Sequence, residues 1–150
     1  MKTFAHLLAD QSGAMAIETA LVAPILLVLS LGGVEAGSMV ARQSELQSAA
    51  AEALNIVQAA PPEDAGDRTA VRDVLMASTG ITDDEDVAVV EIWRCGTASG
   101  FERSNAANCG SSAVSTYIEI TLEETYTPTW TAFGIGSPVT YNVVRQVQIS

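Results

Sequence analysis

The stretch GAMAIETALVAPILLVLSLGGVEAG, residues 13–37, decides the architecture of this chain. Residues 19–34 carry no charge, and Glu18 is the only charged side chain between Gln11 and Val34. A helix rises about 1.5 Å per residue, so about 20 apolar residues cross the ~30 Å hydrocarbon core of a bilayer. The stretch therefore predicts a transmembrane helix near the N-terminus.

The whole chain has the composition of one small acidic domain with an anchoring segment. It has 150 residues, of which 48% are hydrophobic and 17% charged, and this excludes a disordered chain. Acidic residues number 18 against 7 basic ones, a net charge of −11 that repels phosphate backbones. We expect no nucleic-acid partner.

The N-terminal stretch has two general interpretations. In one, Lys2, the apolar residues 21–31 and the sequence VEA at residues 34–36 form a secretory signal peptide, and cleavage near Ala36 releases a soluble secreted binding domain. Helical apolar spacing beyond that position, from Met39 onward, argues against it. In the other, the uncut helix is a static single-pass anchor of a surface protein.

Glu18 favours a third interpretation. A carboxylate at membrane depth costs roughly 2.5–3.5 kcal/mol on insertion scales, so it needs a partner unless it reaches the head-group layer. Cleavage after Gly13 would make Ala14 the N-terminus and place Glu18 four residues later on the same helical face. The free amine of one chain would then neutralise the Glu18 of a neighbour.

These residues resemble a known family. GAMAIE at residues 13–18, followed by TALVAPILLVLSLGG, is similar to the start of type IV prepilin-like proteins, which a prepilin peptidase cuts at a Gly-Ala bond. More narrowly it resembles the TadE-like group of the tight-adherence (Tad/Flp) pilus systems, with the pattern G-A-x-A-x-E-[FY]-A-L-x-x-P-x-L-L. Thr19 stands where that pattern has an aromatic residue. Tyr126-Thr127-Pro128 and the glycine-containing turn at residues 133–136 also resemble this group.

The resemblance implies a minor pilin or pseudopilin that takes part in pilus assembly. It implies a prepilin leader at residues 1–13, a transmembrane assembly helix at 14–37 and an exported head at 38–150. The head, with 15 acidic and 6 basic residues, suits the periplasmic or extracellular side of the inner membrane, with the N-terminus inside. The implied partners are the prepilin peptidase, other pilin subunits, the assembly machinery and membrane lipid.

Three further residues of the helix are candidates for assembly. Pro24 removes a helix hydrogen bond, which either only kinks the helix or, by resemblance to pilins, accompanies its melting on assembly. Gly33 and Gly37 form a GxxxG pair, which permits close helix packing in lipid, although glycine is also frequent in membrane helices.

Beyond the anchor, the sequence predicts an α+β head of type IV pilin-like form. ARQSELQSAAAEALNIVQAA, residues 41–60, continues the helix with an apolar face, and Pro61-Pro62 ends it. Residues 63–79 predict a second helix, with Val74 among its core residues. Residues 87–95, 117–122 and 139–149 predict three strands in a small antiparallel sheet packed against the helices.

Cys95 and Cys109 bracket a polar loop, and we expect a disulfide between them in an oxidising compartment. A metal site there lacks ligands, because the one histidine of the chain is His6. The run DDED at residues 83–86 offers oxygen ligands for calcium but lacks EF-hand spacing, which favours an exposed acidic turn. Without a GxSxG or P-loop motif, we expect no enzyme, no cofactor and no metal.

Overall fold

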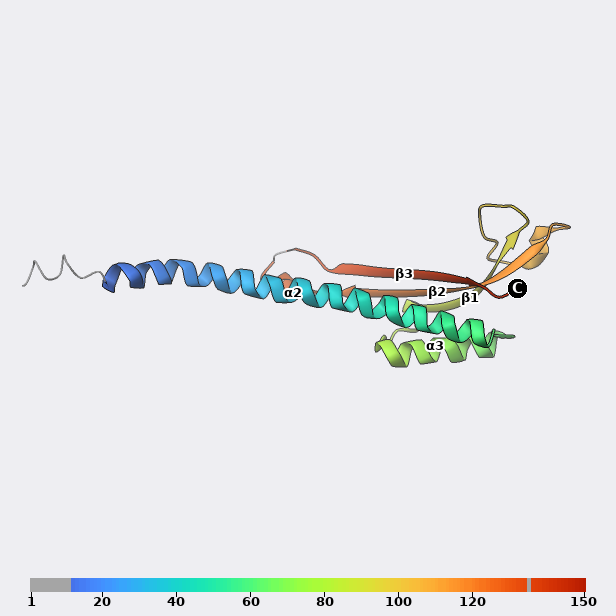
Figure 1. Cartoon of the computed structure of the whole chain (residues 1–150), viewed down its shortest axis with the longest axis horizontal. Coiled ribbons are helices and arrows are strands. Elements are labelled where there is room, and N and C mark those ends of the chain that lie inside the picture. The colour runs from blue at the N-terminus through green and yellow to red at the C-terminus, as the bar shows by residue number, and fades with distance from the viewer. Residues whose placement is uncertain (1–11, 135) are drawn as a thin grey trace, which may run out of the picture. The chain divides into compact units, whose positions relative to one another are not determined.

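The structure is a computed structural model that describes residues 12–134 and 136–150 (Figure 1). Its main elements are two helices, α2 (Ser12–Ala59) and α3 (Ala65–Thr79), followed by three strands, β1 (Val87–Cys95), β2 (Val114–Tyr126) and β3 (Val139–Gln148). Short 3₁₀ helices lie at Asp84–Asp86, Ala106–Cys109 and Thr129–Phe133. The predicted class, α+β with a long apolar N-terminal helix and a small antiparallel sheet, is confirmed. The chain divides at Met39 and Val40 into two units.

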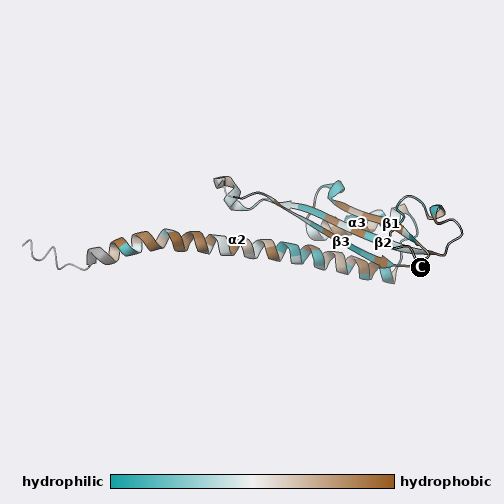
Figure 2. Ribbon diagram, turned by 90° about the horizontal axis from the view of Figure 1, so that it is seen from above, coloured by the Kyte–Doolittle hydropathy of each residue, from teal (hydrophilic) through white to brown (hydrophobic). Residues whose placement is uncertain are grey.

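The first unit holds the apolar half of α2, which we define as residues 15–34. Apolar residues surround this half on all sides, as the brown segment of Figure 2 shows, and its residues are exposed except Gly32, which is half-buried. The helix begins at Ser12, two residues before the predicted start, and passes through Pro24. A helix that is apolar all round is stable where lipid or other helices cover it.

The second unit, the head (residues 40–150), contains the amphipathic end of α2. The predicted apolar face of this end is confirmed, since its members are buried or pack against the core: Leu46, Ala49, Ala50, Ala53, Leu54 and Val57. The intervening residues are mostly exposed. The amphipathic pattern therefore fixes which side of α2 meets the sheet.

Helix α3 has caps at both ends. The Asp64 carboxylate accepts a hydrogen bond from Asp67 N–H at 2.9 Å, so the helix begins at Ala65 and not at residue 63. Gly80 ends it in the left-handed region at φ 74°, where a residue with a Cβ is strained. The expectation for Val74 was wrong. Its side chain is 57% exposed, and Leu75 faces the core instead.

The sheet has the order β1-β2-β3 and is antiparallel throughout. Leu122 of β2 lies opposite Val87 of β1 and Val143 of β3, which fixes the register. β2 runs for 13 residues, longer than predicted, because it pairs with β1 over residues 114–122 and with β3 over residues 117–126. The predicted alternation in the last strand is confirmed, with Tyr141, Val143 and Val147 buried.

We call the side of the sheet that packs against α2 and α3 the helix face, and the opposite side the outer face. The main core lies on the helix face, where Leu46, Leu75, Ile118, Ile120 and Leu122 are all but inaccessible to solvent. Burying one such side chain contributes roughly 1.5–3 kcal/mol. This core belongs entirely to the head.

Candidate functional site

The Gly13–Ala14 bond lies in the first turn of α2. The N–H groups of a helix's first turn have no partners within the helix, and such ends fray readily. The structure describes the backbone here but not the side chains of residues 12–14. The proposed leader, residues 1–13, lies outside the described residues except for its last two.

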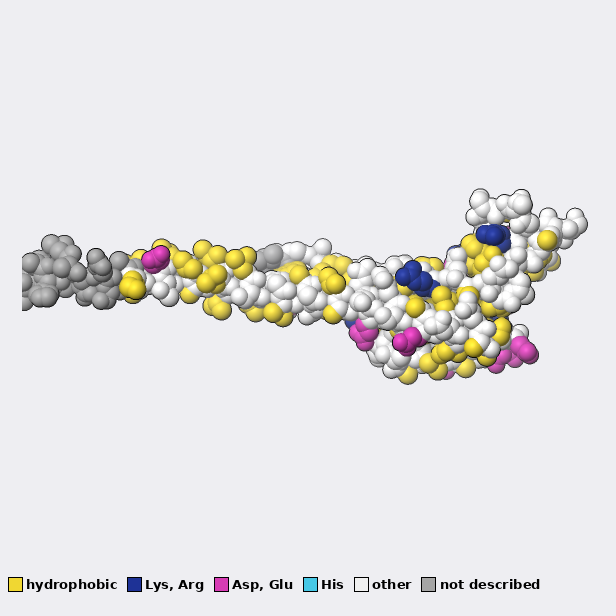
Figure 3. All heavy atoms as spheres, in the orientation of Figure 1, with side chains coloured by type: hydrophobic (Ala, Val, Ile, Leu, Met, Phe, Trp, Pro, Cys, Tyr) yellow, Lys and Arg dark blue, Asp and Glu magenta, His cyan; other side chains and the backbone are white. Residues whose placement is uncertain are grey.

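Glu18 lies one turn beyond Ala14 on the exposed surface of the apolar half. Its neighbours Met15, Ile17 and Leu21 are each 66% exposed, so the carboxylate stands among apolar side chains. Figure 3 shows hydrophobic side chains gathered along this part of the helix. A charge on such a surface calls for a counter-charge once lipid or another helix covers it.

Pro24, Gly33 and Gly37 lie along the same helix. Pro24 has no N–H to donate, so one carbonyl of the preceding turn lacks its helical partner. At Gly33 and Gly37, an added Cβ would meet nothing within 4 Å outside the helix's own backbone. Among the described residues, these glycines therefore serve no packing contact, and their surface is open to another helix.

Arg42 joins three elements of the head. Its Nε and Nη2 donate to the two carboxylate oxygens of Glu124 on β2 at 2.7 and 3.1 Å. Nη2 also donates to the carbonyl of Thr79, the last residue of α3, at 2.7 Å, and Nη1 donates to Glu45 at 2.9 Å. This bidentate arrangement, which we call the Arg42 bridge, ties α2 to both α3 and the sheet.

A charged residue of an amphipathic helix ordinarily belongs to the solvated face, but Arg42 does not. Its side chain is 20% exposed, and the hydrogen bond to Glu124 raises the pKa of Arg42. The helical spacing of Arg42 from the buried residues of α2 could have indicated its position. Arg42 stands four residues before Leu46 and eight before Ala50, so it begins the buried stripe of α2.

Cys95 and Cys109 are joined by a disulfide, with their Cα atoms 5.0 Å apart. The disulfide closes residues 95–109 into what we call the disulfide loop. Glu102 of this loop exchanges two backbone hydrogen bonds, of 2.9 and 2.7 Å, with Trp93 of β1. The Phe101 ring meets that of Tyr117 edge-on, 5.0 Å between centroids. Part of the disulfide loop therefore packs on the outer face of the sheet.

Glu119 is the one buried carboxylate among the described residues, with 3% of its surface exposed. It lies on the outer face of β2, where Arg103 of the disulfide loop binds both of its oxygens, one at 2.8 Å. Gln146 of β3 donates to it at 2.6 Å. The hydrogen bonds from Arg103 hold the pKa of Glu119 below its ordinary value, against the opposing effect of burial.

The acidic run at residues 83–86 forms a short turn before β1. The Asp83 side chain accepts from Glu85 N–H at 3.1 Å, and three of the four side chains are exposed. Among the residues that the structure describes, no three His, Cys, Asp or Glu side chains gather to hold a metal ion.

Comparison with known proteins gives one positive finding. The model of the family described as "TadE-like protein" matches residues 13–54. The match covers the apolar half of α2, including Glu18 and Pro24, and continues past Arg42 into the amphipathic end. Comparisons with curated proteins and with solved structures gave no match. The part of helix α2 from Met15 to Ala59 is also long and apolar enough to cross a membrane, and none of its most apolar 18-residue window is buried.

Proposed function

We propose, on the premise that residues 13–54 make this chain a TadE-like protein of the Tad pilus system, that it is a minor pilin or pseudopilin. Its parts are a prepilin leader at residues 1–13, an assembly helix at 14–37 and an exported head at 38–150. The prepilin peptidase cuts the Gly13–Ala14 bond. The mature protein then associates with other pilus subunits through its assembly helix, and its role is structural, without catalysis.

The observation that carries this proposal is Glu18 on an apolar helix whose surface no described residue of its own unit covers. Cleavage creates an amine at Ala14, one helical turn away from Glu18. Within lipid, the attraction between the amine of one subunit and the carboxylate of another is far stronger than in water. The pair therefore sets the axial position of one subunit against the next.

Pro24, Gly33 and Gly37 support the same role. Pro24 weakens one turn of the helix and so favours local bending or melting when the helix leaves the bilayer. The open surfaces of Gly33 and Gly37 allow a neighbouring helix to approach closely. Before assembly the helix is a single-pass anchor in the inner membrane, with the N-terminus inside and the head in the periplasm.

The first experiment determines the N-terminal residue and the intact mass of the protein recovered from membranes of cells that express the prepilin peptidase. We expect a start at Ala14. A start near Gly37 would instead indicate cleavage near Ala36 and a soluble secreted binding domain. An intact Met1 would indicate a static single-pass anchor.

The second experiment separates membrane insertion from assembly. Glu18→Gln removes the charge and retains the shape, so we expect normal insertion and head folding but a loss of incorporation into pili. Glu52→Gln, at an exposed position of the same helix, is the matched control. Normal piliation with Glu18→Gln would overturn the assembly mechanism.

A further inference from the structure

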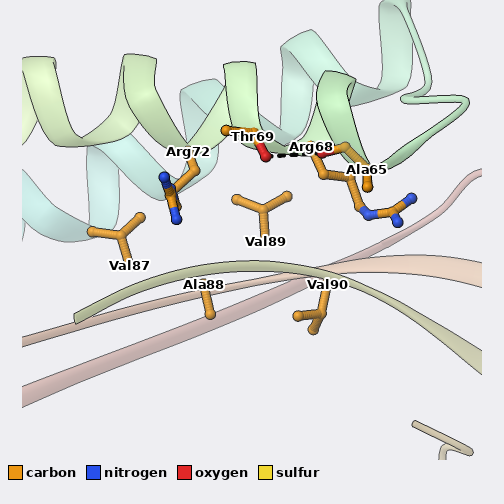
Figure 4. Close-up of a pocket in the computed structure, with 8 residues that line it drawn as sticks. All are labelled: Ala65, Arg68, Thr69, Arg72, Val87, Ala88, Val89 and Val90. Carbon is orange, nitrogen blue, oxygen red and sulfur yellow. Dashed lines mark hydrogen bonds between the residues drawn. The ribbon is translucent and has the colours of Figure 1, made fainter. Parts of the chain in front are cut away.

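A pocket of about 340 Å³ lies between α3 and β1 in the head (Figure 4). The strand contributes four consecutive residues, 87–90, and the helix contributes one face: Ala65, Arg68, Thr69 and Arg72. Figure 4 shows Val87 and Val89 pointing toward α3, and Ala88 and Val90 pointing away. A pocket that touches both faces of a strand opens around its edge.

The backbone at this edge is available for pairing. The N–H and C=O of Trp93 point away from β2, since they bond to Glu102. These groups alternate in direction along a strand, so those of Val87, Val89 and Glu91 point to the same edge. Among the described residues, the Trp93–Glu102 bridge is the only pairing on this side of β1. Residues 87–91 thus form an open strand edge.

The two arginines of the pocket stand one turn apart on α3, and their ion pairs are long. Nη1 of Arg68 lies 3.4 Å from a carboxylate oxygen of Glu91. Nη2 of Arg72 lies 3.4 Å from a carboxylate oxygen of Asp73 and 3.8 Å from one of Asp84. The Arg72 Nε–H is buried and has no hydrogen-bond partner in the part of the chain that the structure describes. Leaving a buried donor unmet is costly, and an acceptor supplied from outside removes that cost.

We propose that an extended, acidic segment of a partner protein adds to the edge of β1 at residues 87–91 and places a carboxylate against Arg72. In this mode of recognition the main chain supplies affinity, and alternate side chains supply specificity. Partner residues opposite Val87 and Val89 face α3. The residue opposite Val87 is therefore Asp or Glu, and the one opposite Val89 is small or β-branched to fit beside Thr69.

A second copy of this chain fits the same edge poorly. Two β1 edges paired about a two-fold axis would lie about 4.8 Å apart, whereas helices packed over them need 8–10 Å. Because α3 packs over β1, the two α3 helices would overlap. The other open edge, β3, carries the sequence VTYNVVRQVQ, which has no acidic residue for Arg72. The required carboxylate points to a different protein.

The test uses the full chain in detergent micelles and the probe peptide acetyl-TETVTET-amide. The probe carries a carboxylate on each side of its valine, so one lies near Arg72 whichever way the strand runs. Two control peptides remove one feature each: acetyl-TQTVTQT-amide lacks the charges, and the same acidic peptide with N-methylvaline lacks the central N–H. Calorimetry measures affinity, and hydrogen exchange reports the Val87 and Val89 amides.

We expect saturable binding of the acidic probe and slower exchange of the Val89 amide. Both control peptides and Arg72→Gln should weaken binding by about tenfold or more. Arg145→Gln, which removes an exposed arginine from β3, should leave the affinity unchanged. If Arg72→Gln prevents folding, the two control peptides on the unaltered chain decide the question.

Equal affinity of the acidic and uncharged peptides would overturn the proposal, and so would no saturable binding or unchanged exchange at Val89. If the chain forms a concentration-dependent dimer that the probe dissociates, the occupant of the β1 edge is a second copy of this chain and not a different protein. The test concerns residues of the head alone. Its failure therefore does not bear on the assembly role of Glu18. Likewise, failure of the Glu18 experiment does not bear on binding at the β1 edge.

Discussion

The two faces of the head's sheet are covered by different means. On the helix face, α2 and α3 bury a continuous set of aliphatic side chains around Leu46 and Leu122. On the outer face, Ile92 and Glu119 are both almost fully buried, and the disulfide loop is held there by a tether and by the ion pair from Arg103 to Glu119. The first kind of cover depends on apolar area and little on solution conditions, while the second depends on redox state and pH.

Truncation on the helix face should have the largest effect. Leu46→Ala leaves a cavity in the centre of the core, and we expect it to lower the free energy of unfolding by about 2–5 kcal/mol. Urea unfolding of the chain in micelles, followed by the fluorescence of Trp93 and Trp130, measures this. Leu27→Ala, at a 64% exposed position of the apolar half, is the control and should leave head stability unchanged. Equal losses would contradict the separation of the two units.

Removal of the tether tests the outer face. Cys95→Ser with Cys109→Ser opens a loop of about 15 residues, and the chain-entropy account predicts a loss of about 3 kcal/mol. Adding a reductant to the unaltered chain should give the same loss in the same unfolding assay. A stability that is indifferent to reductant would mean that the disulfide loop holds its place on the sheet by its side-chain contacts alone.

The Arg42 bridge lies where the helices meet the sheet. Arg42→Met removes the charge but keeps the aliphatic stem, and leaves Glu124 and the Thr79 carbonyl without their donor. Because both ionic side chains are partly exposed, we expect a loss of about 1–3 kcal/mol, less than for a fully buried pair. Arg145→Met should cost less than about 0.5 kcal/mol. Similar losses for the two variants would argue against the bridge.

The smallest effect concerns pH. The pKa of Glu119 is lower in the folded chain than in the unfolded one, so at acidic pH the folded state binds fewer protons than the unfolded state. The stabilisation is complete above about pH 5 and is lost as the pH falls through the folded-state pKa. We expect about 1 kcal/mol, since Arg103 is more than half exposed.

Glu119→Gln should flatten this pH dependence, measured as the unfolding free energy between about pH 6 and 3. Glu85→Gln, which alters an exposed carboxylate, should leave the dependence as it is in the unaltered chain. If both variants follow the same pH curve, the ion pair to Arg103 contributes nothing measurable to the fold.

For the candidate assembly residues, the sequence predicts their positions on the helix but not their function. Glu18, Pro24, Gly33 and Gly37 all lie on one helix, so their spacing follows directly from helical geometry, and the family match covers the same segment. Their function depends on a neighbour outside the chain, and so it stays a prediction.

Local pattern by itself determined the two halves of α2, the position of α3, the inward side of β3 and the α+β class. Each of these depends on residues a few positions apart, where the periods of helix and strand decide which side chains share a face.

Only the tertiary structure decided the polar contacts. Arg42 meets Glu124 across 82 positions of sequence, and Arg103 meets Glu119 across 16. It also decided that Val74 faces solvent and that the edge of β1 stays open beside Arg72. The physical reason is that a polar group can pair with any well-placed polar group, so its partner depends on how the whole chain folds. The periodicity of apolar residues, in contrast, depends only on residues a few positions apart.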